Sequence, residues 1–172
     1  MLDMRAFYNQ SILAIFWVSG FLTTISAANA QMSYKEKESI SSTMAAKIDR
    51  SIKGYRQEGS FFRERVISRL AECGDLFMFM SRHTDLETGK RIADVAEISF
   101  QVSKRVSEGI AIDRFKEITE TARRSLEEKL ATEPTSESEQ EMRNLLENCK
   151  SFHKIDGVSD AVTALLPSAS ER

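Results

Sequence analysis

The chain has 172 residues, with 24 Lys and Arg against 26 Asp and Glu, which gives a formal net charge of -2. A hydrophobic content of 41% beside 29% charged residues excludes an intrinsically disordered chain and a protein with many membrane spans. Only two Pro and seven Gly argue against an all-β sandwich, whose many turns need more of both.

The N-terminal segment has the pattern of a cleaved signal peptide. An apolar run over residues 12–22 is followed by Ala28 and Ala30, the A-x-A pattern that a signal peptidase reads. The alternative is an uncleaved anchor helix, but the run is interrupted and shorter than the roughly 20 apolar residues of a span. We therefore expect residues 1–30 to be removed, Gln31 to become the N-terminus, and the protein to be periplasmic or secreted without stable membrane insertion.

Two helices are predicted after this segment. Apolar residues recur every four positions within residues 33–54, which indicates an amphipathic helix. A second helix is predicted over residues 60–82, with Ser60 as its N-cap. Its apolar residues step by three and four and form one narrow stripe: Phe62, Val66, Leu70, Cys73, Phe77 and Met80.

The five consecutive apolar residues 76–80 cover every side of the second helix, so this turn cannot be half in water. One interpretation is that the helix is central and surrounded by the others. The other is that Met78 and Phe79 form an interaction surface for a second subunit or an apolar client, because Met adapts to many partners. Both interpretations stay open at this point.

The rest of the chain predicts further helices with recognisable start signals. Thr84 and Glu87 have capping-box spacing for a third helix, although Gly89 favours a later start. Asp113 is the expected cap of a fourth helix, which ends near residue 130. A linker over residues 133–141 contains the start signal of the next helix.

That start signal is the pair Ser136 and Glu139, again with capping-box spacing, and Asp156-Gly157 is expected to end this fifth helix. A short helix is expected between residue 158 and Pro167. The prediction is a single all-α bundle of four to five helices over residues 31–166, with residues 167–172 as a disordered tail.

Cys73 and Cys149 are the only two cysteines of the chain, and each lies in the apolar stripe of its own helix. Both can therefore face one core, and two facing thiols in an oxidising compartment form a disulfide. The alternative is a pair of separate buried thiols, since free Cys packs as a small hydrophobe. We predict the disulfide.

The two histidines offer little evidence for a cofactor. His153 lies on the inward side of its helix, where a histidine is usually a hydrogen-bonded residue at the edge of the core. The more specific alternative is an axial haem ligand, paired with Met78 or Met80. His83 lies near the end of the second helix, where it complements the helix dipole. We expect no metal and no cofactor, because neither His has ligand spacing to another donor.

Basic residues gather in residues 47–69, and acidic residues in residues 133–147. One interpretation is that the basic segment binds an anionic surface such as lipid headgroups or envelope polymers. The alternative, which we favour, is that the two segments offset each other within the fold or are simply solvated. Nucleic acid is not expected as a partner, because the net charge is slightly negative and no basic motif with interleaved aromatics occurs.

Catalytic signatures such as G-x-S-x-G, H-E-x-x-H and the P-loop are missing from the sequence. We expect an exported, non-catalytic helical envelope protein that acts through protein–protein interaction or self-association. The partner would be another envelope protein or a second copy of the chain. The alternative is a carrier of haem or of a small apolar ligand, with a pocket between helices.

Overall fold

The computed structural model describes residues 31–54, 59–132, 135–154 and 157–165, and these residues form helices and no strand. The predicted all-α bundle is confirmed. Its helices are α2 (Tyr34–Gly54), α3 (Gly59–Ser81), α4 (Leu86–Val106), α5 (Ile112–Ala131), α6 (Ser136–Phe152) and α7 (Val158–Thr163). The signal segment with Ala28 and Ala30, and the tail 167–172, lie outside the described residues.

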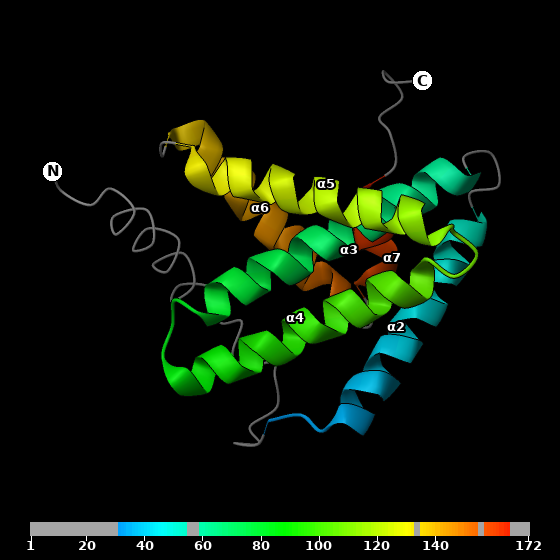
Figure 1. Cartoon of the computed structure of the whole chain (residues 1–172), viewed down its shortest axis with the longest axis horizontal. Coiled ribbons are helices and arrows are strands. Elements are labelled where there is room, and N and C mark those ends of the chain that lie inside the picture. Colours follow the sequence, from blue (N-terminus) through cyan, green and yellow to red (C-terminus); the bar gives the residue numbers. More distant parts are fainter. Residues whose placement is uncertain (1–30, 55–58, 133–134, 155–156, 166–172) are drawn as a thin grey trace, which may run out of the picture.

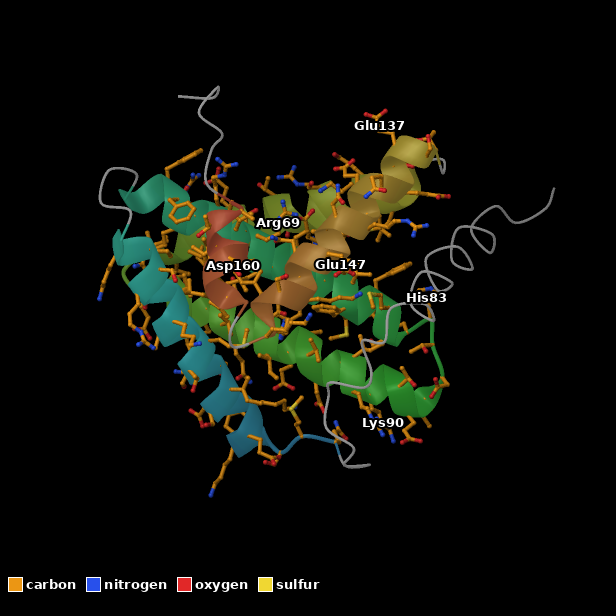
Figure 2. The ribbon with its side chains drawn as sticks, turned by 180° about the vertical axis from the view of Figure 1, so that it is seen from behind. Arg69, His83, Lys90, Glu137, Glu147 and Asp160 are labelled. Carbon is orange, nitrogen blue, oxygen red and sulfur yellow. A yellow bond between two sulfur atoms is a disulfide. The ribbon has the colours of Figure 1, made fainter. Side chains whose placement is uncertain are left out.

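The central helix of the bundle is α3, which packs against α2, α4, α5 and α6. It lies between α4 and α5, with α6 behind it (Figure 1), and from the back α6 and α7 lie in front of it (Figure 2). Its predicted stripe is fully buried, and residues on its other sides are buried as well: Ile67, Ala71 and Leu76. In the apolar turn, Leu76, Phe77 and Met80 are buried, whereas Met78 and Phe79 are only partly buried.

The connection between α3 and α4 is short, and Asp85 is the N-cap of α4. The Asp85 side chain accepts hydrogen bonds from the backbone N–H groups of Glu87 and Thr88. The prediction that Thr84 caps this helix is thus wrong by one residue. Gly89 does not delay the helix either: a Cβ atom at Gly89 would lie 2.5 Å from the carbonyl oxygen of Ser81. Glycine allows the first turn of α4 to approach the end of α3 at this point.

The turn between α4 and α5 contains Gly109, whose φ of 90° lies in the region that favours glycine. The N-cap of α5 is Ala111, which offers no side-chain hydrogen bond, and Asp113 lies in the first turn of the helix. The predicted cap at Asp113 is therefore wrong, although a carboxylate in the first turn still complements the helix dipole. An ion pair of 2.5 Å between Arg114 and Glu64 joins the start of α5 to α3.

The start of α6 is a capping box one residue earlier than the sequence predicts. The Thr135 hydroxyl accepts a hydrogen bond from the Ser138 backbone N–H, and the Ser138 hydroxyl accepts one from the Thr135 N–H. Ser136 is thus the first residue of the helix and not its cap. The prediction at Ser60 differs in the same way, since α3 already begins at Gly59.

A buried charge cluster joins α2 to α4. The Lys37 ammonium lies 3.1 Å from Oδ1 of Asp94 and also pairs with Glu97, while Oδ2 of Asp94 accepts a 2.9 Å hydrogen bond from the Met32 backbone N–H. Lys37 and Asp94 are both buried. Hydrogen bonding to Glu97 is the largest influence on Lys37 and raises its pKa, so the ammonium stays charged.

Candidate functional site

The predicted disulfide joins α3 to α6 in the core. Cys73 and Cys149 are bonded, their Cα atoms are 5.4 Å apart, and both side chains are fully buried. The bond closes a sequence separation of 76 residues. It gives no sign of redox chemistry, because a buried disulfide is out of reach of an attacking thiolate. Its role is structural.

His153 lies one helical turn beyond Cys149 and faces the core. Its Nε2 atom shares a 2.7 Å hydrogen bond with the Ser99 hydroxyl of α4, and its ring meets Phe77 edge-on at a centroid distance of 5.4 Å. Burial lowers the pKa of His153 to about 4, so the ring is neutral near pH 7. Because Nε2 is already engaged, the geometry favours a structural role over that of an axial haem ligand.

The other predicted surface residues lie at the far end of α3. Phe79 is partly buried, packs against the core and stacks on the His83 ring at a centroid distance of 4.3 Å. His83 is exposed, and its Nδ1 lies 2.7 Å from the Phe79 carbonyl oxygen, which it satisfies at the helix end. Met78 is also partly buried. An interaction surface at Met78 and Phe79 stays a prediction.

Gln31, the expected mature N-terminus, is exposed and is the first described residue.

The basic segment 47–69 is partly neutralised by nearby acids. Arg63 pairs with Asp49 at 2.8 Å, and Arg69 pairs with Glu72 at 2.7 Å. In these two pairs the basic residues are neutralised by carboxylates close in sequence and not by the acidic segment 133–147.

The structure reveals a cavity of about 390 Å³ between α3, α4 and α5. This volume is within the usual range of ligand pockets, about 300–1,000 Å³. Each of the three helices contributes side chains at helical spacing. The lining residues are Ala71, Asp75, Phe100, Ser103, Lys104, Phe115, Thr119, Glu120 and Arg123.

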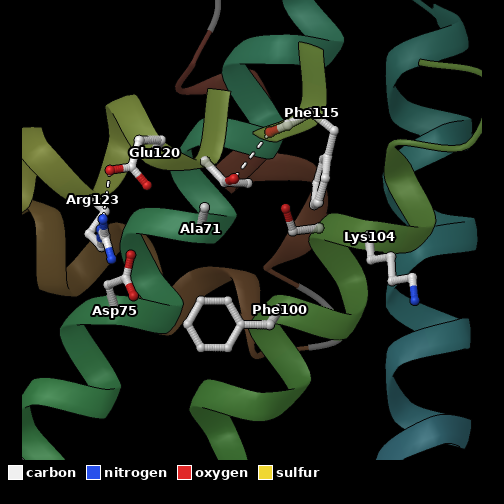
Figure 3. A pocket seen from close by; sticks show the side chains of 9 residues that line it. Ala71, Asp75, Phe100, Lys104, Phe115, Glu120 and Arg123 are labelled. Carbon is white, nitrogen blue, oxygen red and sulfur yellow. Dashed lines mark hydrogen bonds and ion pairs between the residues drawn. The ribbon is translucent and has the colours of Figure 1, made fainter. Parts of the chain in front are cut away.

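Two phenyl rings line this cavity beside the carboxylates of Asp75 and Glu120 and the guanidinium of Arg123 (Figure 3). Phe100 and Phe115 come from α4 and α5, and both rings are partly buried. The two hydroxyls in the lining are occupied by backbone carbonyls: Ser103 donates to the Ile67 carbonyl at 3.4 Å, and Thr119 to the Phe115 carbonyl at 3.1 Å. The remaining polar groups are charged.

The charges around the cavity are not equally paired. Arg123 forms ion pairs with Glu120 at 2.6 Å and with Glu127 at 3.9 Å. The Lys104 side chain extends away from the cavity (Figure 3). Asp75 has neither a hydrogen bond nor an ion pair with any residue that the structure describes.

Asp75 is held in a partly desolvated position. Burial raises its pKa, and the positive charge of Arg123, which it faces in Figure 3, offsets part of that effect. A partly buried carboxylate with a perturbed pKa beside apolar walls is a mark of functional sites. Asp75 cannot be recognised as a site residue from the sequence, because a lone Asp on a helix is usually solvated.

The described residues also offer no metal site and no membrane span. They contain no group of three or more His, Cys, Asp or Glu side chains placed to hold a metal ion. None of their helices is long and apolar enough to cross a membrane. No family model, curated protein or solved structure matches this chain.

Proposed function

We propose that this chain is an exported, non-catalytic protein that acts by binding another molecule. The observation that carries the proposal is the buried disulfide between α3 and α6, because such bonds form and persist in oxidising compartments. The A-x-A pattern at Ala28 and Ala30 supports the same route. We place the protein in the periplasm or outside the cell.

The molecule bound is, in this proposal, a small ligand held in the cavity between α3, α4 and α5. A cavity of about 390 Å³ has the volume of a small-molecule site, and its lining sets two aromatic rings beside charged side chains that can fix the orientation of a ligand. On this support we propose the small-ligand alternative ahead of the protein partner that the sequence alone favours. Bundles commonly form such sites between facing helices.

Mass spectrometry of the protein purified from its own host tests this proposal. Under native conditions the mass should exceed that of the chain, and denaturation should release the added mass as a small molecule. The chain itself should begin at Gln31 and carry one disulfide. A bare chain that retains residues 1–30 and two free thiols would contradict both export and binding.

A second candidate function is binding of a protein partner or a second copy through the end of α3. Phe79 and Met78 are only partly covered, and Leu86 at the adjoining start of α4 is 77% exposed. Together they leave apolar surface at one end of the molecule.

Melting and sedimentation of a Phe79→Ala variant separate the two roles of this end. An interface predicts weaker association with little change in melting temperature, whereas a packing role predicts a lower melting temperature with unchanged association. Ile112→Ser is a matched control, because Ile112 is 73% exposed at the start of α5.

A further inference from the structure

We propose that the cavity between α3, α4 and α5 binds an organic cation, a primary or quaternary amine attached to an apolar body. This inference rests on the proposed small-ligand function and names the ligand class of that site. Three features support it: the Asp75 carboxylate, which has no ion pair among the described residues, the aromatic rings in the walls, and the cavity volume of about 390 Å³.

The unpaired charge is negative. Arg123 faces Asp75 and offsets part of its charge, but it also pairs with Glu120 and Glu127. The Lys104 side chain extends away from the cavity. Asp75 has no ion-pair partner among the described residues and is partly desolvated. A cation that enters the cavity would give this carboxylate a direct counter-charge, which Arg123 supplies only in part and without an ion pair.

The walls favour a cation with an apolar body. Phe100 and Phe115 both line the cavity. The face of an aromatic ring attracts an ammonium group, and quaternary ammonium ligands are commonly recognised by aromatic rings. The same rings bury hydrocarbon, which neither a metal ion nor a free inorganic cation would exploit. Asp75 and the two rings therefore select for an amine that carries apolar groups.

An anionic ligand fits the same cavity less well. A carboxylate or phosphate would approach the negative charges of Asp75 and Glu120, and the Arg123 cation beside them is already shared with Glu120 and Glu127. Like charges in a partly desolvated site repel, so the carboxylate of Asp75 disfavours an anion. A neutral ligand gains contact with the rings alone. The expected order of affinity is cation first, then neutral molecule, then anion.

Calorimetric titration of the mature disulfide-bonded protein with three probes of similar size tests this order. The probes are benzyltrimethylammonium, benzyl alcohol and phenylacetate. We expect benzyltrimethylammonium to bind at least tenfold more tightly than either of the others. Equal or tighter binding of phenylacetate would overturn the cation proposal.

The variant Asp75→Asn tests the role of the carboxylate without changing its shape. It should weaken benzyltrimethylammonium binding at least tenfold and leave benzyl alcohol binding unchanged. Phe100→Leu should weaken the binding of both probes. Asp160→Asn, on α7 and outside the cavity, serves as the matched control and should change neither affinity. Circular dichroism melting establishes that each variant folds.

The outcomes distinguish the two proposals. If the probes bind in a way that depends on Phe100 but not on Asp75, the cavity is a ligand site and the cation proposal fails. If no probe binds, the cation proposal also fails, while the native mass of the host-purified protein still decides whether it carries a different small ligand.

Discussion

Gly74 and Phe100 fit together at the contact between α3 and α4. A Cβ atom placed on Gly74 would lie 2.6 Å from Cε1 of the Phe100 ring and 2.8 Å from Cδ1. Glycine inside a helix costs about 1 kcal/mol relative to alanine, and here the phenyl ring occupies the space that a side chain would need. This contact also fixes one wall of the cavity, because Phe100 lines it.

We therefore predict that Gly74→Ala lowers stability although alanine is the better helix former. The methyl group forces the Phe100 ring aside, which costs about 1–3 kcal/mol by overpacking, against a gain of about 1 kcal/mol in helix propensity. The expected net loss is about 1 kcal/mol in the free energy of unfolding, measured in urea.

A double-mutant cycle with Phe100→Ala isolates this contact. In the Phe100→Ala background the clash is gone, so Gly74→Ala should raise stability there by its helix propensity. A stabilising effect of Gly74→Ala with Phe100 still present would contradict the packing argument.

The disulfide between Cys73 and Cys149 should contribute strongly to stability. It closes a sequence separation of 76 residues, for which the chain-entropy model gives about 4 kcal/mol. The variant Cys73→Ala/Cys149→Ala should lose about that amount of unfolding free energy. A reductant should lower the melting temperature of the wild type and leave that of the variant unchanged. Two titratable thiols in the denatured, unreduced protein would disprove the bond.

The ion pair between Lys37 and Asp94 should be costly to break from one side. Lys37→Met leaves the Asp94 carboxylate buried with only the Met32 backbone N–H, and an uncompensated buried charge costs about 3–5 kcal/mol. Lys37→Met/Asp94→Leu removes both charges and should recover most of the loss in thermal unfolding. If the double variant is no more stable than Lys37→Met, the argument from the unpaired carboxylate fails.

Local patterns predict much of this fold. The stripe from Phe62 to Met80 is buried, the helix boundaries of α2 and α3 agree within a residue, and the disulfide forms between two stripes. These features depend on helical periodicity within each segment. The misplaced caps of α4 and α6 have one cause: Asp85 and Thr135 each lie beside another residue with a capping side chain, Thr84 and Ser136. The cap of α5 is Ala111, which has no capping side chain and therefore leaves no such signal in the sequence.

The cavity could not be predicted in the same way. Ala71 and Asp75 are one turn apart on α3, and Phe115, Thr119 and Arg123 follow the same spacing on α5. Such spacing is visible in the sequence, but periodicity within one helix does not tell which helix faces another. The burial of Lys37 cannot be predicted from the sequence either. A lysine is almost never buried unless it is paired, and here the partners lie on another helix.

His153 should make the stability of the bundle depend on pH. Its pKa is lowered from 6.5 to about 4 by burial in the folded protein. Between these values the unfolded chain binds a proton that the folded protein does not. The stability that comes from keeping His153 neutral is therefore fully present above about pH 6.5 and is lost as the pH falls toward 4. At pH 5 linkage gives a loss of about 2 kcal/mol relative to pH 7.

The variant His153→Phe separates this effect from the titration of carboxylates. The phenyl ring can keep the edge-on contact with Phe77, and the Ser99 hydroxyl can still donate to the Val95 carbonyl, which lies 3.2 Å away. Urea unfolding at pH 7 and pH 5 should therefore differ by about 2 kcal/mol less in this variant than in the wild type. His83→Gln is the control, because His83 is exposed and its removal should leave the difference intact. Equal pH dependence in the wild type and His153→Phe would show that the folded ring takes up its proton as readily as the unfolded one.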